Sequence, residues 1–242
     1  PRPSRRGFSF ARRRPIASPM DFQAIIFDCD GVLVDSEVLA IRGERAALET
    51  LGLPYTPEEY VRRFVGLHDA AFFDQLKDDH RARLGAPAPP DFEERVLDGR
   101  RREMHALSVI AGADEALIAA RARVGRIAVA SSSRAVFLES KLKRMGLFDL
   151  ASPHVYSADL VAAGKPAPDI FLYTAAKIGA DPARCLVLED SVNGVRAGLA
   201  AGMTVWGFTG GGHCFEGYGA RLAAAGAHEI IADYAVFLDA LV

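Results

Sequence analysis

Two carboxylates stand at the end of a short apolar run near the start of the chain. The run 24–27 (AIIF) has the composition of a strand that is buried on both faces, and Asp28 and Asp30 come directly after it. Like charges at the end of a buried strand lower stability, because they repel each other and lose their water. Ligands of open parallel sheets bind at the carboxyl ends of the strands. The pair could therefore hold a hard cation, act as a nucleophile or carry a proton, whereas aspartates that only cap turns are the alternative interpretation.

Other predicted strands also end in polar residues. Ser131 ends the run 126–131 (RIAVAS), and Glu189 and Asp190 end the run 185–190. Lys165 precedes a predicted helix at 168–178. Right-handed crossovers bring such strand ends to one edge of a parallel sheet, where a single ligand can contact all of them. Carboxylates that hold Mg²⁺, with a lysine and a hydroxyl that bind the transferring group, suit phosphoryl transfer.

The elements that must position these residues follow an alternating pattern. Strands are expected at 24–27, 126–131, 154–158, 185–189, 204–208 and 229–231, with helices between them. This alternation indicates an α/β fold with a parallel sheet that helices cover on both sides. Residues 36–105 contain helical patterns only. We therefore expect a catalytic core of 20–35 and 106–242, with an all-helical cap inserted at 36–105.

Composition limits the class of protein. The chain has 242 residues, 50% hydrophobic and 25% charged, which is typical of a globular protein. Residues 1–19 carry six arginines and no acid, so the rest of the chain has a formal charge of −8 (−2 for the whole chain, less +6). An acidic body argues against nucleic-acid binding, and no apolar run approaches a membrane span. Three cysteines without a C-x-x-C pair favour a cytoplasmic location, and the six histidines show no close ligand spacing.

The first nineteen residues lack helical or strand periodicity. We expect a disordered or non-native basic tail, and translated upstream or cloning-derived sequence is favoured because Met20 stands just before the first strand. An organelle transit peptide and a basic arm for acidic partners are the other interpretations.

Four motifs together resemble those of the haloacid dehalogenase superfamily. They are, in order, D-C-D-G-V-L-V-D-S from Asp28, the serine run from Ser131, G-K-P-A-P-D around Lys165, and L-E-D-S-V-N-G-V-R-A-G around Asp190. The resemblance covers residues 22 to about 208, and is strongest to the phosphatases and β-phosphoglucomutase-like enzymes with a helical cap. It implies a Rossmann-like core with about five parallel strands.

The resemblance also implies roles for the motif residues. Asp28 would be the nucleophile, and Asp30 would protonate the leaving oxygen and then act as a base on water. Mg²⁺ would bind the Asp28 carboxylate, the Asp30 carbonyl and Asp190, with Glu189 as a direct or water-mediated partner. Phosphate would be held by Ser131, Lys165 and the backbone amides near Cys29 and Ser132. Ser191 is expected to cap the next helix.

Departures from related patterns favour a phosphatase. Mutases that resemble β-phosphoglucomutase have a histidine early in the cap, where this chain has Ala40. They also have cationic residues around a cap glycine, where this chain has Val65 and Asp69. We therefore expect Mg²⁺-dependent hydrolysis of a small sugar or polyol phosphate through an aspartyl-phosphate. A β-phosphoglucomutase-type sugar phosphomutase and a non-catalytic module that binds phosphorylated ligands are the alternatives. We expect a monomer or weak homodimer.

Specificity is expected to come from the cap and from the entrance of the site. The candidate contacts are Glu37, Arg62 and His68 in the cap and Arg134 after the serine run. For each of them, a solvent-exposed or structural role is the alternative. The sequence GGGH at 210–213 follows the last core strand but lacks the lysine of a phosphate-binding loop, so we expect a flexible loop at the rim of the site.

Overall fold

The core is a parallel six-stranded sheet, seen in a computed structural model that describes residues 22–65, 67 and 69–241. The strand order is β3-β2-β1-β4-β5-β6. The strands are β1 (Ala24–Phe27), β2 (Ile127–Ser131), β3 (Val155–Ser157), β4 (Cys185–Glu189), β5 (Thr204–Phe208) and β6 (Glu229–Ile231). The predicted α/β class is confirmed, with one strand more than the five that the resemblance implied.

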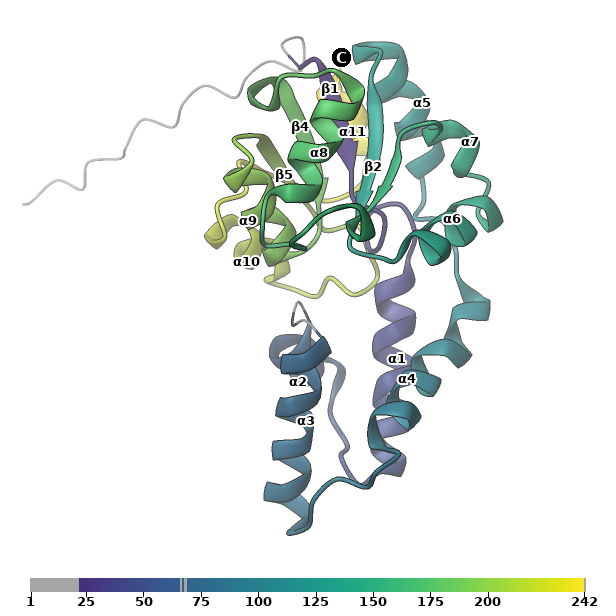
Figure 1. Ribbon diagram of the computed structural model, residues 1–242, viewed down its shortest axis with the longest axis vertical. Coiled ribbons are helices and arrows are strands. Elements are labelled where there is room, and N and C mark those ends of the chain that lie inside the picture. Colours follow the sequence, from purple (N-terminus) through teal and green to yellow (C-terminus); the bar gives the residue numbers. More distant parts are fainter. Residues whose placement is uncertain (1–21, 66, 68, 242) are drawn as a thin grey trace, which may run out of the picture.

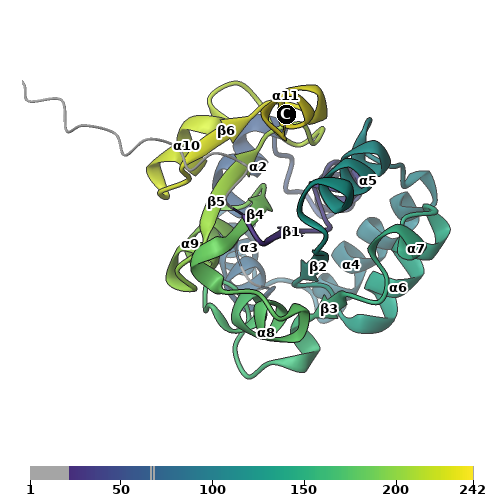
Figure 2. The ribbon, with the colours of Figure 1, turned by 90° about the horizontal axis from the view of Figure 1, so that it is seen from above.

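Helices cover both faces of the sheet (Figures 1 and 2). One face carries α5 (Ala113–Val124), α7 (Phe148–Ala151) and α11 (Tyr234–Leu241), and the other α8 (Asp169–Ile178), α9 (Val192–Ala200) and α10 (Tyr218–Ala224). The helices α7 and α11 were not predicted from the sequence. Helix α6 (Ala135–Arg144) lies near the edge strand β3.

Alternate residues of the central strand point to opposite faces, as the pleat of a strand requires. Ile26 belongs to one buried apolar cluster, and Ile25 and Phe27 belong to the other. Ile26 is in register with Ala128 of β2 and with Val187 of β4. Because these central strands are completely buried, their sequences are continuous apolar runs.

Among the described residues, four α-helices lie within the stretch 36–105, which was predicted to be helical. They are α1 (Ser36–Thr50), α2 (Pro57–Phe64), α3 (Asp69–Leu84) and α4 (Phe92–Glu103), followed by the short helix Met104–Ala106. The helix α2 begins as its sequence indicates, because the Thr56 side chain accepts a hydrogen bond from the Glu59 N–H and Pro57 is the first helical residue. None of the described helices is long and apolar enough to cross a membrane.

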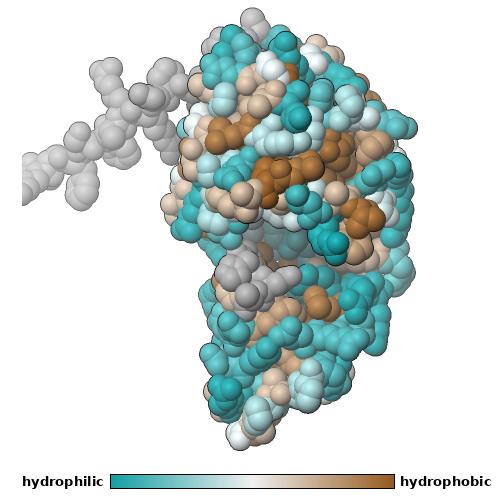
Figure 3. Space-filling model, in the orientation of Figure 1, coloured by the Kyte–Doolittle hydropathy of each residue, from teal (hydrophilic) through white to brown (hydrophobic). Residues whose placement is uncertain are grey.

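The chain leaves the core and returns to it through two adjacent segments. Val34 forms a bridge with Val109, the Asp35 N–H donates to the Ser108 carbonyl (3.0 Å), and the Ile110 N–H donates to the Leu33 carbonyl (3.0 Å). The helices α1 to α4 extend from this crossing below the carboxyl edge of the sheet (Figure 1). A hollow separates them from the core on the face shown in Figure 3. On the basis of this crossing, we propose that the cap comprises residues 36–105 and that the core comprises the residues before and after it.

Candidate active site

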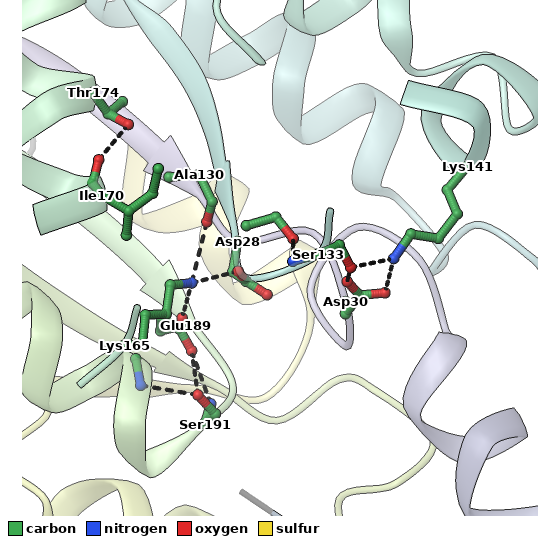
Figure 4. A network of polar contacts seen from close by, with 12 residues as sticks. Asp28, Asp30, Ala130, Ser133, Lys141, Lys165, Ile170, Thr174, Glu189 and Ser191 are labelled. Atoms are coloured by element: carbon green, nitrogen blue, oxygen red, sulfur yellow. Dashed lines mark hydrogen bonds and ion pairs between the residues drawn. The ribbon is translucent and has the colours of Figure 1, made fainter. Parts of the chain in front are cut away.

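Asp28 and Glu189 share one buried lysine. The Lys165 Nζ lies 2.6 Å from Asp28 Oδ1, 2.6 Å from Glu189 Oε1 and 3.1 Å from the Ala130 carbonyl oxygen (Figure 4). The Lys165 side chain is only 5% exposed, so the ammonium group is held by these oxygens and not by water. Strands β1 and β4 are neighbours, which is why their terminal acids meet at one cation.

The charges around Asp28 act on its pKa in opposite directions. Burial raises the pKa of Asp28 well above its ordinary value; the positive charge of Lys165 opposes this, and the charges of Glu189, Asp190 and Asp30 add to it. Burial also disfavours a charged Lys165, but Asp28 and Glu189 raise its pKa above the ordinary value. Two carboxylates, of Asp28 and Glu189, thus share the Lys165 ammonium group.

Asp30 has a different set of partners. The Ser36 hydroxyl donates to its Oδ1 (2.5 Å) and the Ser133 hydroxyl to its Oδ2 (2.7 Å), and Lys141 of α6 forms an ion pair with the same carboxylate. The Lys141 Nζ also donates to the Ser133 hydroxyl (2.9 Å). Although burial opposes it, these cationic and hydrogen-bonding partners lower the pKa of Asp30 below its ordinary value. Figure 4 shows Lys141 and Lys165 on opposite sides of the loop after β1.

Glu189 is fixed on its second oxygen by the start of α9. The Ser191 N–H and hydroxyl both lie 3.0 Å from Glu189 Oε2, and the Ser191 oxygen accepts from the Gly194 N–H at 3.0 Å. The predicted cap by Ser191 is confirmed. Both oxygens of Glu189 therefore have partners within the protein, and its role toward a cation stays a prediction.

Asp190 faces a histidine that the sequence analysis placed in a flexible rim loop. The His213 Nε2 lies 3.1 Å from Asp190 Oδ2, and the His213 side chain is completely buried. His213 is therefore buried at the site although Gly212 beside it is exposed, and the flexibility of this loop stays a prediction. Burial alone would lower the pKa of His213, but the hydrogen bonds with Asp190 and Cys214 raise it to about 11.

Gly31 allows the loop after β1 to approach Asp190. Its φ is +75°, and a Cβ atom built there would lie 1.9 Å from Asp190 Oδ2. Only glycine satisfies both the backbone conformation and the close approach.

Two serines of the run that begins at the end of β2 have different surroundings in the site. Ser131 is 1% exposed, and its hydroxyl oxygen accepts a hydrogen bond from the Ser133 N–H (3.0 Å). Ser132 is exposed. Ser131 therefore lies at the end of a central strand beside Asp28, and Ser133 extends to Asp30. The role of Ser131 and Ser132 in phosphate binding stays a prediction.

The specificity candidates lie in different surroundings. Glu37, at the start of α1, is partly buried near Asp190 and Asp30, and its pKa is raised to about 7, chiefly by burial. Arg62 is exposed on α2, and the exposed Arg134 lies with its guanidinium carbon 5.9 Å from the Phe137 ring centre. Of the candidates that lie among the described residues, Glu37 is the one that the structure brings toward the acidic cluster. His68 lies outside the described residues.

The residues present fit a hard divalent cation. Within the described part of the chain, no three Cys, His, Asp or Glu side chains form a ready-made metal cage. The predicted set instead uses two carboxylates, of Asp28 and Asp190, with the Asp30 carbonyl. These hard oxygen donors suit Mg²⁺, which keeps several waters as ligands, and the crowding of acids around Asp28 is what a cation would relieve.

Three residues of the site were missed from the sequence. They are Ser133, Lys141 and His213. Ser133 belongs to the quoted serine run, and the rule that polar residues after a strand gather at one sheet edge also applies to His213, five residues after β5. Lys141 carried no comparable signal, because a lysine in the middle of a charged helix is usually exposed.

Comparisons with known proteins agree with this fold. A family model described as haloacid dehalogenase-like hydrolase matches residues 22–202. The chain therefore belongs to the haloacid dehalogenase-like hydrolases.

Three individual proteins show which kinds of hydrolase this chain is similar to. The chain is 32% identical to hexitol phosphatase B of Escherichia coli over 78% of its own length and 84% of that protein. It is also 32% identical to SUPPRESSOR OF QUENCHING 1 of Arabidopsis thaliana, over 74% of its own length, but spans only 17% of that protein. A hydrolase from Deinococcus radiodurans, solved with bound phosphate and sodium, superposes with a TM-score of 0.78 at 35% identity, over 90% of this chain and 94% of that one.

Proposed function

We propose that the protein is a Mg²⁺-dependent phosphatase that hydrolyses a small phosphorylated metabolite, a sugar or polyol phosphate, through an aspartyl-phosphate on Asp28. Its class as a phosphomonoesterase rests on the family and on relatives such as hexitol phosphatase B. The observation that carries the mechanism is that Asp28 and Asp30, two residues apart, have separate cationic partners in Lys165 and Lys141. One carboxylate can therefore act as a nucleophile while the other handles a proton.

The first step is attack by a carboxylate oxygen of Asp28 on phosphorus. The bond between phosphorus and the leaving oxygen breaks, and Asp30 gives that oxygen a proton. Asp30 must hold this proton in the substrate complex, where the negative phosphate ester beside it opposes its ionisation. Lys165 and Ser131 stabilise the phosphoryl oxygens with an ammonium group and a hydroxyl. The sugar or polyol leaves as an alcohol, and Asp28 carries the phosphoryl group.

The second step returns the enzyme to its starting state. Asp30, now ionised, takes a proton from a water molecule, and that water attacks phosphorus. The bond between Asp28 and phosphorus breaks, which releases inorganic phosphate. Mg²⁺, held by Asp28, Asp190 and the Asp30 carbonyl, would supply charge neutralisation for the phosphoryl group.

Substitution of the nucleophile gives the direct test. Asp28→Asn should lower the rate of phosphate release from hexitol and glycerol phosphates by at least about 10³-fold, because an amide cannot form the covalent intermediate. EDTA should abolish release from the wild type, and added Mg²⁺ should restore it. The matched control is Asp114→Asn, which changes an exposed aspartate of α5 and should keep normal activity.

Three results would contradict the proposal. Turnover by Asp28→Asn at the wild-type rate, or turnover that needs no metal, would exclude the mechanism. An isomerised sugar phosphate without free phosphate would favour a mutase. Tight binding of all the esters without any turnover would favour a binding module.

A further inference from the structure

The loop after β5 carries a buried histidine for which the proposed reaction has no use. His213 is 5% exposed as a residue, and the ring nitrogen Nε2 lies 3.1 Å from one oxygen of Asp190. Asp190 directly follows the last residue of the neighbouring strand β4. The contact therefore joins the loop after β5 to the residue that follows β4. It lies at the edge of the sheet where the proposed metal ligands gather.

The imidazole ring is held on several sides. The Tyr218 ring of α10 packs edge-on against it, with centroids 5.2 Å apart. The Cys214 Sγ lies 3.4 Å from Nε2. On the core side, a Cβ atom at Gly31 would come within 2.9 Å of His213 Cε1. The ring has little freedom to rotate, so its Nε2 remains directed at Asp190.

The same loop is fixed to the point where the chain enters α1. The Gly212 N–H donates to Asp35 Oδ1 at 2.9 Å, and a Cβ atom at Gly211 would come within 2.8 Å of the Gly31 carbonyl oxygen. The loop is thus placed by the backbone that carries Asp28 and Asp30. A side chain on such a fixed support is suited to orient a neighbour.

We propose that His213 is a positioning residue that holds the Asp190 carboxylate in the orientation needed for the divalent cation. Its Nε2–H donates to Asp190 Oδ2, so that the other carboxylate oxygen, Oδ1, can bind the metal. An aspartate without this partner would rotate more freely and would lose more entropy on binding. Partners of metal ligands typically contribute 10- to 100-fold in metal affinity. The inference rests on the proposed function, because it needs Asp190 to be a metal ligand.

The alternative is that His213 only fills space beneath the loop. Two kinds of variant separate these roles. In His213→Gln the amide group can still donate a hydrogen bond to Asp190, whereas His213→Met has a similar length but no donor. His213→Phe also lacks the donor and keeps a ring against Tyr218. A space-filling role predicts that Gln and Met behave alike.

Calorimetric titration of the whole chain with Mg²⁺ tests the inference. We expect His213→Met and His213→Phe to weaken Mg²⁺ binding about 10- to 100-fold, and His213→Gln to stay within about 3-fold of the wild type. The Mg²⁺ concentration for half-maximal activity should rise in parallel, with kcat at saturating Mg²⁺ little changed. Circular dichroism identifies any variant that fails to fold, and either donor-free variant then suffices.

Two outcomes would overturn the role of His213 and leave the proposed metal site standing. They are wild-type Mg²⁺ affinity in a folded donor-free variant, and equal weakening in His213→Gln and His213→Met. Asp190→Asn serves as the reference for the proposed function. If it binds Mg²⁺ as the wild type does, the proposed metal site itself fails and the role of His213 fails with it.

Discussion

At the scale of single residues, the pKa values of two carboxyl groups of the site, those of Asp28 and Asp30, are shifted in opposite directions. Burial and neighbouring acids raise the pKa of Asp28, whereas Lys141 and two serine hydroxyls lower the pKa of Asp30 although burial opposes this. The motif residues Asp28, Lys165 and Glu189 could be placed together from the sequence, because strand ends meet at one sheet edge. The contacts of Asp30 and Asp190 could not, because they depend on how far α6 and the loop after β5 extend toward that edge.

Glu37 gives a prediction about pH and stability. Its pKa rises from an ordinary value of 4.5 to about 7 on folding, first through burial and then through the charges of Asp190 and Asp30. The protonated carboxyl therefore favours the folded state below pH 4.5, and this contribution is lost as the pH rises through 7. Relative to Glu37→Gln, the wild type should lose about 1–3 kcal/mol of unfolding free energy between pH 4.5 and 8.

Urea unfolding in EDTA at several pH values measures this difference. The exposed Glu115 on α5 supplies the control, since Glu115→Gln should show no such trend. A difference between wild type and Glu37→Gln that stays constant with pH would show that Glu37 keeps its ordinary pKa on folding.

At the scale of elements, α1 connects the chemistry to the cap. It begins at Ser36, whose hydroxyl binds Asp30, and it packs along α4. Strands and most helix starts could be predicted, since Thr56 and Ser191 form caps with local hydrogen bonds. The short helix α7 and the final helix α11 were missed. The structure shows that α11 packs against α5, a tertiary contact that local patterns do not reveal.

The crossing of α1 and α4 depends on two glycines. A Cβ atom at Gly43 would lie 2.1 Å from the Gly99 carbonyl oxygen, which is a backbone atom and cannot move alone. Gly43→Ala should therefore force the helices apart and lower the unfolding free energy by about 1–3 kcal/mol. Thermal or urea unfolding measures the change, with Gly164→Ala as control, because nothing lies within 4 Å of a Cβ atom at Gly164. Unchanged stability of Gly43→Ala would mean that the two helices are not packed this closely.

At the scale of the whole molecule, the fold places the strand ends opposite a set of helices, with a hollow between them (Figure 3). The alternation of strands and helices, and the helical stretch after β1, were predictable because each follows from local periodicity. How the cap approaches the core depends on the paired crossing at Val34 and Val109, which local periodicity does not encode. We infer that the covalent chemistry uses Asp28, Asp30 and Lys165 of the core, with Ser36 of α1 as a partner of Asp30.

Direct trapping of the phosphoenzyme tests this central claim. Wild-type enzyme is mixed with Mg²⁺ and a hexitol phosphate carrying labelled phosphorus, quenched in acid within one turnover, and digested into peptides. The account predicts label on the peptide that contains Asp28, and none in Asp28→Asn. Rapid hydrolysis without any labelled peptide, or label on a peptide that lacks Asp28, would contradict it.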